Sequence, residues 1–233
     1  MKALVIILAL IIIETNLTQV DKYSQLRNKM VDTQIRDRGI TDQDVLRAMR
    51  KVPRHLFVPD NYVDDAYEDY PLPISHGQTI SQPYIVAYMT EAAGPSKKKK
   101  ALEIGTGSGY QAAVLAETSE IVYSIEIIPE LASEAAATLK KLGYENVIVR
   151  AGDGYNGWPE HAPFDLILVT AAADRIPQPL IDQLAEGGRL VIPVGRQGAI
   201  QELMLVTKKR GKVETGRLIY VRFVPFKRSG ITD

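Results

Sequence analysis

The chain has 233 residues, of which 45% are hydrophobic and 24% charged, a composition typical of a globular protein with one substantial core. Its formal net charge is zero, whereas a dedicated nucleic-acid-binding protein usually carries a basic excess, so we expect no nucleic-acid partner. Cysteine is absent, which excludes a disulfide framework and thiolate chemistry. The three histidines are scattered without the spacing of metal ligands, so we expect no metal site.

Residues 1–20 form an apolar leader, in which Lys2 precedes the run from Ala3 to Ile13. This run is too short for a typical membrane span and is closer to the hydrophobic region of a signal peptide, yet no small-x-small cleavage site follows it. An uncleaved anchor and a mis-assigned start, with Met30 as the alternative, both remain open. We expect residues 21–233 to form a single domain and to touch a membrane only if the leader is retained.

The first part of that domain is predicted to be a helical cap. A helix is expected from Tyr23 to Arg38, and Thr41 is a candidate N-cap for a second helix that ends at Pro53. Residues 54–82 are irregular and rich in Pro, Tyr and Asp, which suits a loop-bearing wall or lid.

Helical spacing returns from Pro83 to Ala93, with Ser81 as a candidate N-cap. An alternative interpretation of the polar segment from His76 to Pro83 is a wall over a binding site. The lysine run at 97–100 is interpreted as a solvated turn before a buried strand.

Strands then alternate with helices along the rest of the chain. Strands are predicted at 101–104, 121–125, 147–150, 164–170, 189–194, 202–207 and 218–223, and helices at 111–117, 129–141 and 178–186. This alternation indicates a parallel sheet, and the last two strands suggest an antiparallel hairpin. The predicted fold is α/β: a doubly wound, mostly parallel, seven-stranded Rossmann-like sheet with a C-terminal antiparallel hairpin and an N-terminal helical cap.

The most informative segment is Leu102–Tyr110, where Gly105, Gly107 and Gly109 stand at alternate positions between a strand and a helix. Glycines at such a turn let the backbone approach a ligand closely. Dinucleotide enzymes use G-x-G-x-x-G, a frame that requires glycine at the position of Tyr110. The observed spacing favours a ligand without a pyrophosphate, such as S-adenosylmethionine (SAM). The alternative is a glycine-rich turn that binds nothing.

Further candidates stand at the predicted strand ends, where ligands bind in open α/β sheets. Glu126 follows the second strand and is placed to accept both ribose hydroxyls, and Asp153 follows the third and is placed to bond an adenine amino group. Thr170-Ala171-Ala172 follows the fourth strand, and these small side chains leave room for a reacting group. Glu103 is expected either to meet the ammonium of the cofactor or to order the glycine loop.

Five ordered motifs resemble the protein-L-isoaspartate O-methyltransferase family from about Met30 to Phe226. They are Gly77-Gln78-Thr79-Ile80-Ser81-Gln82-Pro83, Leu102–Tyr110, Gly152-Asp153-Gly154, Pro193-Val194-Gly195 and Arg222-Phe223-Val224-Pro225-Phe226. The resemblance implies a methyltransferase that uses SAM to methylate the α-carboxyl group of L-isoaspartyl residues in damaged proteins and peptides. Such methylation initiates repair through a succinimide.

The resemblance also implies roles for individual residues. Ser81 would be the catalytic residue and would bind substrate together with Thr79, Ile80, Val221 and Phe223. The cofactor-binding residues would be Glu103, Gly105, Thr106, Gly107, Ser108, Gly109, Glu126, Asp153, Gly154 and Thr170.

Three other functions remain open: a SAM-dependent methyltransferase acting on RNA or a small metabolite, an NAD-linked oxidoreductase, and a binding module with an inactive site. The neutral net charge and the 77–83 motif count against RNA, and Tyr110 counts against NAD. An inactive site would require the loss of several loop residues, and none of the expected ones is missing. Because SAM is made in the cytosol, we expect a cytoplasmic protein, and we expect a monomer.

Overall fold

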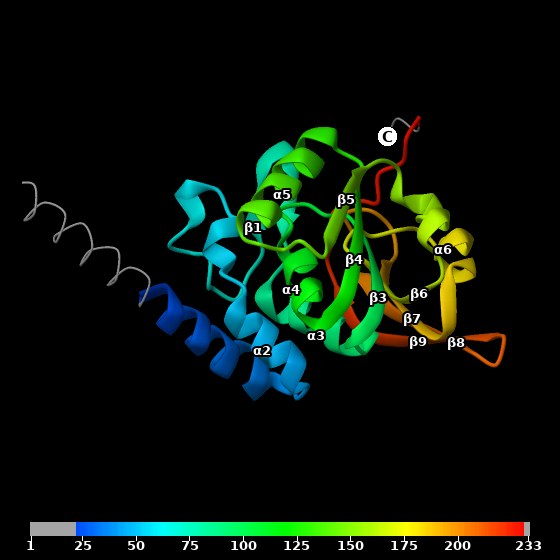
Figure 1. Cartoon of the computed structure of the whole chain (residues 1–233), viewed down its shortest axis with the longest axis horizontal. Helices are drawn as coiled ribbons and strands as arrows, with labels where there is room; N and C mark the ends of the chain where they lie inside the picture. Colours follow the sequence, from blue (N-terminus) through cyan, green and yellow to red (C-terminus); the bar gives the residue numbers. More distant parts are fainter. Residues whose placement is uncertain (1–21, 231–233) are drawn as a thin grey trace, which may run out of the picture.

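The computed structural model describes residues 22–230, so the predicted leader at residues 1–20 lies outside the described residues. Figure 1 shows a central sheet with helices packed against it and an N-terminal helical cap at one side. Within residues 22–230, every helix is either too short or too polar to span a bilayer.

Seven strands form one sheet in the order β5-β4-β3-β6-β7-β8-β9. The first five of these strands run parallel, whereas β8 is antiparallel to both β7 and β9. The strands are β3 (Ser96–Ile104), β4 (Ser119–Glu126), β5 (Val147–Ala151), β6 (Phe164–Val169), β7 (Leu184–Val194), β8 (Gln201–Lys209) and β9 (Lys212–Val221). The predicted doubly wound sheet and its C-terminal hairpin are therefore confirmed. The strand order reverses between β3 and β6, which is the topological switch point where such sheets bind ligands.

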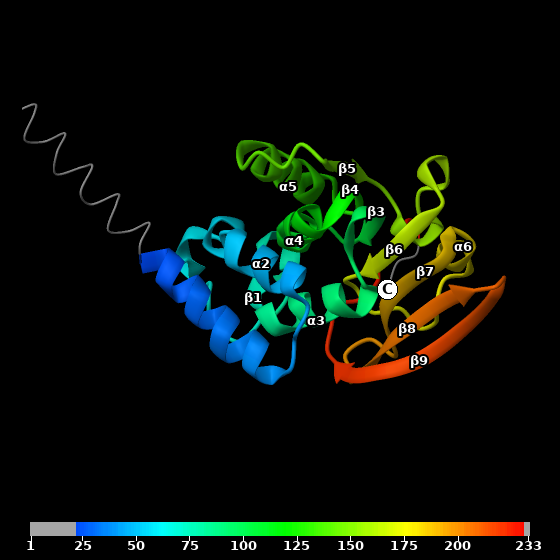
Figure 2. The same cartoon turned by 60° about the horizontal axis from the view of Figure 1, so that its bottom comes forward.

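Helices α3, α4 and α5 cover the face of the sheet that also meets the cap, and α6 lies on the opposite face (Figure 2). The α-helices labelled in Figure 1 are α2 (Gln43–Lys51), α3 (Pro83–Ala93), α4 (Tyr110–Thr118), α5 (Pro129–Lys141) and α6 (Gln178–Asp182). Residues 22–30 are also α-helical. Shorter helical turns span Val31–Ile35, Arg36–Arg38, Arg54–Phe57, Asp60–Tyr62, Ser75–Gly77, Gly154–Asn156 and Pro159–His161, and β1 (Leu72–Pro73) pairs with β2 (Thr79–Ile80).

The lysine run belongs to β3, so its interpretation as a solvated turn was wrong. The ammonium of Lys97 donates a hydrogen bond to the carbonyl of Ala116, 3.1 Å away, and Lys99 donates to the carbonyl of Gly94. These carbonyls lie at the C-terminal ends of α4 and α3, where backbone acceptors are left without helical partners and positive charge is favourable. The run therefore extends the strand and caps two helices.

Two predicted N-caps were also wrong. The N-cap of α2 is Asp42 rather than Thr41, and its carboxylate accepts hydrogen bonds from the N–H groups of Asp44 and Val45. Helix α3 begins after Gln82, so Ser81 lies one residue before the cap position. The hydroxyl of Ser81 therefore does not cap α3.

A third correction concerns the predicted helix at 178–186. Helix α6 ends at Asp182, and β7 already begins at Leu184, so that strand runs through Gly187 and Gly188.

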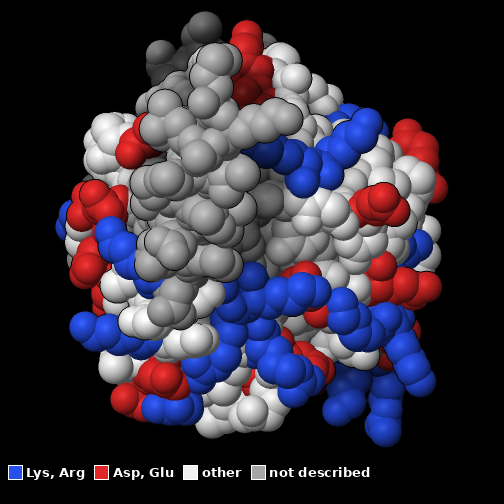
Figure 3. Space-filling model, turned by 60° about the vertical axis from the view of Figure 1, so that its left-hand side comes forward, with Lys and Arg blue, Asp and Glu red and all other residues white. Residues whose placement is uncertain are grey.

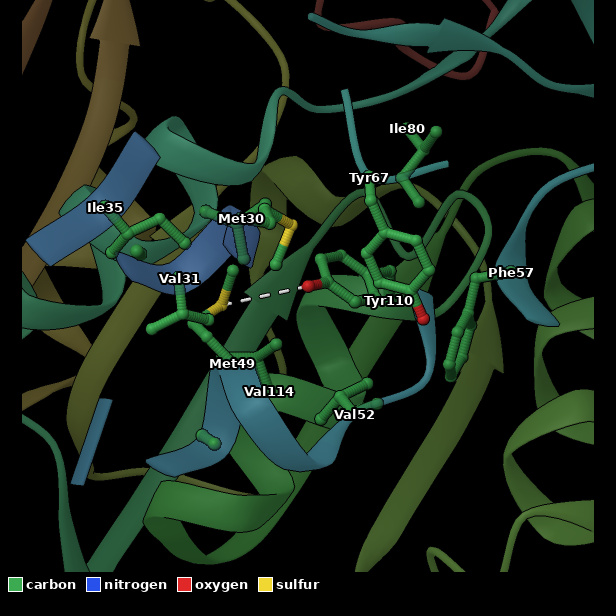
Figure 4. Packing of buried hydrophobic residues seen from close by; sticks show 14 of the residues in the cluster. Met30, Val31, Ile35, Met49, Val52, Phe57, Tyr67, Ile80, Tyr110 and Val114 are labelled. Carbon is green, nitrogen blue, oxygen red and sulfur yellow. Dashed lines mark hydrogen bonds between the residues drawn. The ribbon is translucent and has the colours of Figure 1, made fainter. Parts of the chain in front are cut away.

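Tyr110, the residue that breaks the dinucleotide frame, lies at the centre of the packing between cap and sheet (Figure 4). Only 1% of it is exposed. Its ring meets the edge of Phe57 with 5.6 Å between centroids, and its hydroxyl points to the sulfur of Met49 at 3.8 Å. The guanidinium of Arg54, itself fully buried, lies 4.8 Å from the same ring. A large aromatic side chain at this position therefore joins the glycine loop to the helical cap.

The cap presents many basic side chains, and acidic ones stand among them on the face seen in Figure 3. Arg38 pairs with Asp69, and Arg50 pairs with Asp32, at 2.9 and 2.7 Å. Because these pairs are partly exposed, we expect each to contribute little to stability.

Candidate active site

A cavity opens at the carboxyl ends of β3, β4 and β6, the edge at which open α/β sheets bind ligands. Its walls come from the 78–81 segment, the glycine loop, the strand ends and the segment that follows β9. The lining residues are Gln78, Thr79, Ile80, Ser81, Val86, Ile104, Gly105, Thr106, Gly107, Ser108, Tyr110, Gln111, Ile125, Glu126, Ile127, Gly154, Thr170, Ala171, Val224, Pro225, Phe226 and Lys227. The structure thus brings together most of the predicted site residues.

The glycine loop needs its glycines for backbone geometry and for space. Gly105 has a φ of +94°, and a Cβ there would lie 2.4 Å from the hydroxyl oxygen of Thr170. That hydroxyl donates to the carbonyls of Gly105 and Ile104, at 2.6 and 3.1 Å. Thr170 therefore clamps the first turn of the loop. Gly109 lies outside the cavity wall, and its φ of +87° forms the start of α4.

Glu126 lines the cavity and also holds the loop. Its two carboxylate oxygens accept hydrogen bonds from the N–H groups of Gly107, at 2.9 Å, and Ile128, at 3.0 Å. Only 5% of the residue is exposed. A carboxylate has about four acceptor positions, so these two bonds leave positions for a ribose diol.

Glu103 lies inside β3, fully buried and outside the cavity wall. The hydroxyl of Ser124 donates to its carboxyl group and also pairs at 2.6 Å with the hydroxyl of Thr106, which does line the cavity. Burial raises the pKa of Glu103 to about 8, so the group is mainly protonated at neutral pH. Glu103 therefore lies behind the glycine loop and is linked to it through the hydroxyls of Ser124 and Thr106.

Asp153 also lies outside the cavity wall, although its neighbour Gly154 is part of it. The Oδ1 atom accepts from the N–H of Tyr155 at 3.0 Å, and Oδ2 accepts from Arg228 Nε at 2.9 Å and from the N–H of Ser229 at 3.1 Å. Partial burial opposes ionisation, but these hydrogen bonds prevail and lower the pKa of Asp153. A Cβ on Gly154 would lie 2.3 Å from Ile104 Cγ2, so only glycine fits beside the cavity floor.

A second hollow, which we call the acceptor groove, adjoins the cavity. It is lined by Pro71, Thr79, Ser81, Gln82, Ile85, Ile200, Tyr220, Val221, Arg222, Phe223 and Val224. Thr79, Ser81 and Val224 line both hollows, whereas the buried Ile80 lines the cavity alone. The hydroxyl of Ser81 has no hydrogen-bond partner among residues 22–230. Ser81 is thus a free donor at the junction of the two hollows.

Some residues that line the cavity were not predicted from the sequence. Ile125 and Ile127 flank Glu126, so their position beside a strand-end carboxylate was an available signal. Gln111 comes from the first turn of α4, where its side-chain amide donates to Thr90 at 3.0 Å. Val86 comes from α3 and carried no local signal.

These residues fit a sulfonium nucleoside. A carboxylate suits a ribose, the apolar side chains of Ile127 and Phe226 suit a purine, and Gly105 and Gly154 leave space that a Cβ would fill. Within residues 22–230, no three His, Asp or Glu side chains gather as a candidate metal site.

Known proteins share this sequence and architecture. Residues 25–230 match the sequence profile described as Protein-L-isoaspartate(D-aspartate) O-methyltransferase (PCMT). The chain is 63% identical over 202 residues to the protein-L-isoaspartate O-methyltransferase of Opitutus terrae, covering 87% of each chain. It is 61% identical over 199 residues to that of Gloeobacter violaceus, covering 85% of this chain and 97% of the relative.

A solved structure from Plasmodium falciparum, assigned to the same enzyme class and in complex with S-adenosyl-L-homocysteine, is also similar. It superposes with a TM-score of 0.75 at 29% identity, over 87% of this chain and 99% of that chain. The sequence motifs, the fold and these relatives agree, and the chain belongs to the protein-L-isoaspartate(D-aspartate) O-methyltransferase family.

Proposed function

We propose that this chain transfers the methyl group of SAM to the α-carboxyl group of L-isoaspartyl residues in damaged proteins and peptides. The observation that carries the proposal is the meeting of two hollows at Ser81. The cavity carries the carboxylate and glycines suited to a nucleoside, the acceptor groove adjoins it, and Thr79, Ser81 and Val224 belong to both.

The reaction makes modest demands on acid–base chemistry. SAM supplies a methyl group that its sulfonium already activates. A carboxyl group has an ordinary pKa around 4, so the acceptor is ionised at neutral pH and needs no general base. The carboxylate oxygen forms a bond to the methyl carbon while the bond from that carbon to sulfur breaks. The chain must therefore align the reacting atoms, which supplies a large part of catalysis in such reactions.

Ser81 is the catalytic residue in this proposal. Its unpartnered hydroxyl donates a hydrogen bond to the acceptor carboxylate and turns one oxygen toward the cofactor. Thr79 and Ile80 flank it, and Val221 and Phe223 hold the peptide in the groove. The amide oxygen of Gln201 accepts from the N–H of Phe223 at 2.9 Å, which fixes the backbone as it leaves β9.

The geometry of the cavity supports the cofactor-binding roles proposed here. Glu126 accepts the ribose hydroxyls, and Gly105, Thr106, Gly107 and Ser108 bring loop atoms to the ligand. Thr170 clamps the loop, and Glu103 and Gly109 support it from outside the wall. Gly154 leaves space beside the floor, and Asp153 binds the adenine amino group from its position next to the cavity.

Methylation matters because an ester is a better acyl donor than a carboxylate. The neighbouring backbone nitrogen then attacks the ester and closes a succinimide, with methanol as the leaving group. Hydrolysis of that ring returns part of the material as normal aspartate, so the chain only needs to start the sequence.

The test is an assay of S-adenosyl-L-homocysteine formation with three acceptors: an isoaspartyl hexapeptide, the same hexapeptide with normal aspartate, and RNA. We expect product only with the isoaspartyl peptide, together with a base-labile methyl ester on that peptide. Equal rates on the two peptides, or transfer to RNA alone, would contradict the proposal.

A further inference from the structure

We propose that Arg228 is a positioning residue for adenine recognition, because it fixes the Asp153 carboxylate so that one acceptor position faces an exocyclic amino group. This inference rests on the proposed function, since it assumes that the cavity binds a SAM-type nucleoside. It adds a residue that lies after the last motif of the resemblance and far from Asp153 in sequence.

The segment carrying Arg228, residues 224–229, is here called the C-terminal strap. It is anchored first at the end of β6, where the N–H of Ala172 donates to the carbonyl of Val224 and the N–H of Phe226 donates to the carbonyl of Ala172, both at 2.8 Å. The strap then crosses toward the end of β5, as the red trace in Figure 1 shows. It therefore spans the carboxyl edge of the sheet beside the cavity, and Phe226 and Lys227 form part of the cavity wall.

The second anchor of the strap is Arg228 itself. Its Nε donates to Asp153 Oδ2 at 2.9 Å, and its guanidinium carbon lies 3.5 Å from the centre of the Tyr155 ring. The side chains of Arg228 and Asp153 are 30% and 14% exposed, so the pair is shielded from much of the solvent. A guanidinium that both stacks on a ring and forms a charge-assisted hydrogen bond holds its partner in a defined orientation.

The hydrogen bonds of Asp153 leave little acceptor capacity. Oδ2 already receives two N–H groups, from Arg228 and Ser229, and Oδ1 receives the N–H of Tyr155. Each carboxylate oxygen offers about two acceptor positions, so the remaining position is on Oδ1. An adenine amino group can donate to it, whereas a purine with a carbonyl at that position would bring two acceptors together.

This arrangement predicts that Arg228 controls discrimination between purines. Without Arg228, Oδ2 loses a charged donor and the carboxylate can rotate or admit water. Recognition of the amino group should then weaken more than recognition of the ribose and amino-acid parts, which other residues contact.

The experiment is calorimetric titration of the purified full chain with S-adenosyl-L-homocysteine and with S-inosyl-L-homocysteine, which has a carbonyl in place of the amino group. We expect the unmodified chain to prefer the adenosyl compound by about tenfold or more. Arg228→Met should reduce that ratio by about fivefold or more, because a fixed charged donor is lost. Ser229→Pro keeps the guanidinium but removes the second donor to Oδ2, and it should shift the ratio in the same direction.

Arg38→Met is the matched control, since Arg38 also pairs with an aspartate (Asp69, 2.9 Å) and stacks on a tyrosine (Tyr84, 3.7 Å), but at the junction of the cap and α3. Its ratio should equal that of the unmodified chain, and thermal melts should show that every variant is folded. An unchanged ratio in both Arg228→Met and Ser229→Pro, or no preference in the unmodified chain, overturns the inference while leaving methyl transfer intact. If the unmodified chain binds neither compound, the proposed function itself fails.

Discussion

The carboxylate of Glu126 accepts a hydrogen bond from the backbone N–H of Gly107, with 2.9 Å between Oε2 and the nitrogen. The two residues come from different βα units, so this bond ties the end of β4 to the glycine loop after β3. It fixes the loop relative to the carboxylate that we propose binds the ribose, because the same side chain also accepts a hydrogen bond from the N–H of Ile128.

We therefore expect Glu126→Gln to weaken SAM binding by about tenfold or more, equivalent to about 1.4 kcal/mol. A glutamine has only one oxygen, so its NH₂ group would face one of the two backbone donors. Calorimetric titration of SAM measures the effect. Glu120→Gln, at an exposed position of the same strand, is the control. Equal affinities in the two variants would show that the Glu126 charge and its hydrogen bonds do not support the cofactor.

Gly152 and Gly154 flank Asp153 and provide a matched pair of substitutions. A Cβ on Gly154 would clash with Ile104, whereas a Cβ on Gly152 meets no atom within 4 Å. We expect Gly154→Ala to lower the free energy of unfolding by about 1–3 kcal/mol, and Gly152→Ala to change it by less than about 0.5 kcal/mol. Urea denaturation measures both. Similar losses in the two variants would mean that crowding at Ile104 is not the reason for glycine at 154.

Ser81→Ala should slow turnover without affecting cofactor binding or stability. A lost hydrogen bond to a charged group costs about 1.5–3 kcal/mol, so we expect kcat on an isoaspartyl peptide to fall by about tenfold to a hundredfold. Because Ser81 does not cap α3, the free energy of unfolding should stay constant, whereas loss of a true cap would cost about 1 kcal/mol.

The control for Ser81→Ala is Ser133→Ala, at an exposed position of α5. Near-normal turnover in Ser81→Ala would remove the catalytic role of this hydroxyl. A fall in stability with unchanged kcat would instead point to a structural role.

Local sequence patterns were sufficient to predict the sheet and the glycine loop. Central parallel strands are buried on both faces, so their sequences are almost wholly apolar. The run Phe164–Val169 shows this pattern. The glycine spacing likewise reports a backbone requirement, which the positive φ values of Gly105 and Gly107 bear out. Glu126 could be found because strand ends meet at one edge of such a sheet.

The remaining features depend on contacts between distant segments, which a local pattern does not contain. The lysines at 97 and 99 extend β3 because carbonyls at the ends of α4 and α3 lie within reach of their ammonium groups. The partner of Asp153 is Arg228, from the far end of the chain. Gln111 and Val86 line the cavity because α4 and α3 turn those faces toward it, and neither residue has a distinctive neighbour.

The buried carboxyl group of Glu103 gives the chain a measurable pH dependence of stability. Burial raises its pKa from 4.5 to about 8, so between these values the folded state keeps a proton that the unfolded state has released. The contribution of Glu103 is therefore complete below about pH 4.5 and is lost as the pH rises toward 8, by about 1.4 kcal/mol per pH unit. Glu103→Gln cannot titrate and should lack this contribution.

The measurement is the free energy of unfolding, in urea, of the unmodified chain and of Glu103→Gln at several pH values from 5 to 8. We expect the unmodified chain to lose stability relative to Glu103→Gln as the pH rises. Only in the unmodified chain does folding require the Glu103 carboxyl group to keep a proton that it releases when unfolded. Glu120→Gln is the control because that side chain is exposed. The difference in unfolding free energy between the unmodified chain and Glu120→Gln should stay nearly constant with pH. A difference between the unmodified chain and Glu103→Gln that is level or grows with pH would mean that Glu103 is ionised in the folded chain. The group behind the glycine loop would then be a buried charge rather than a neutral carboxyl group.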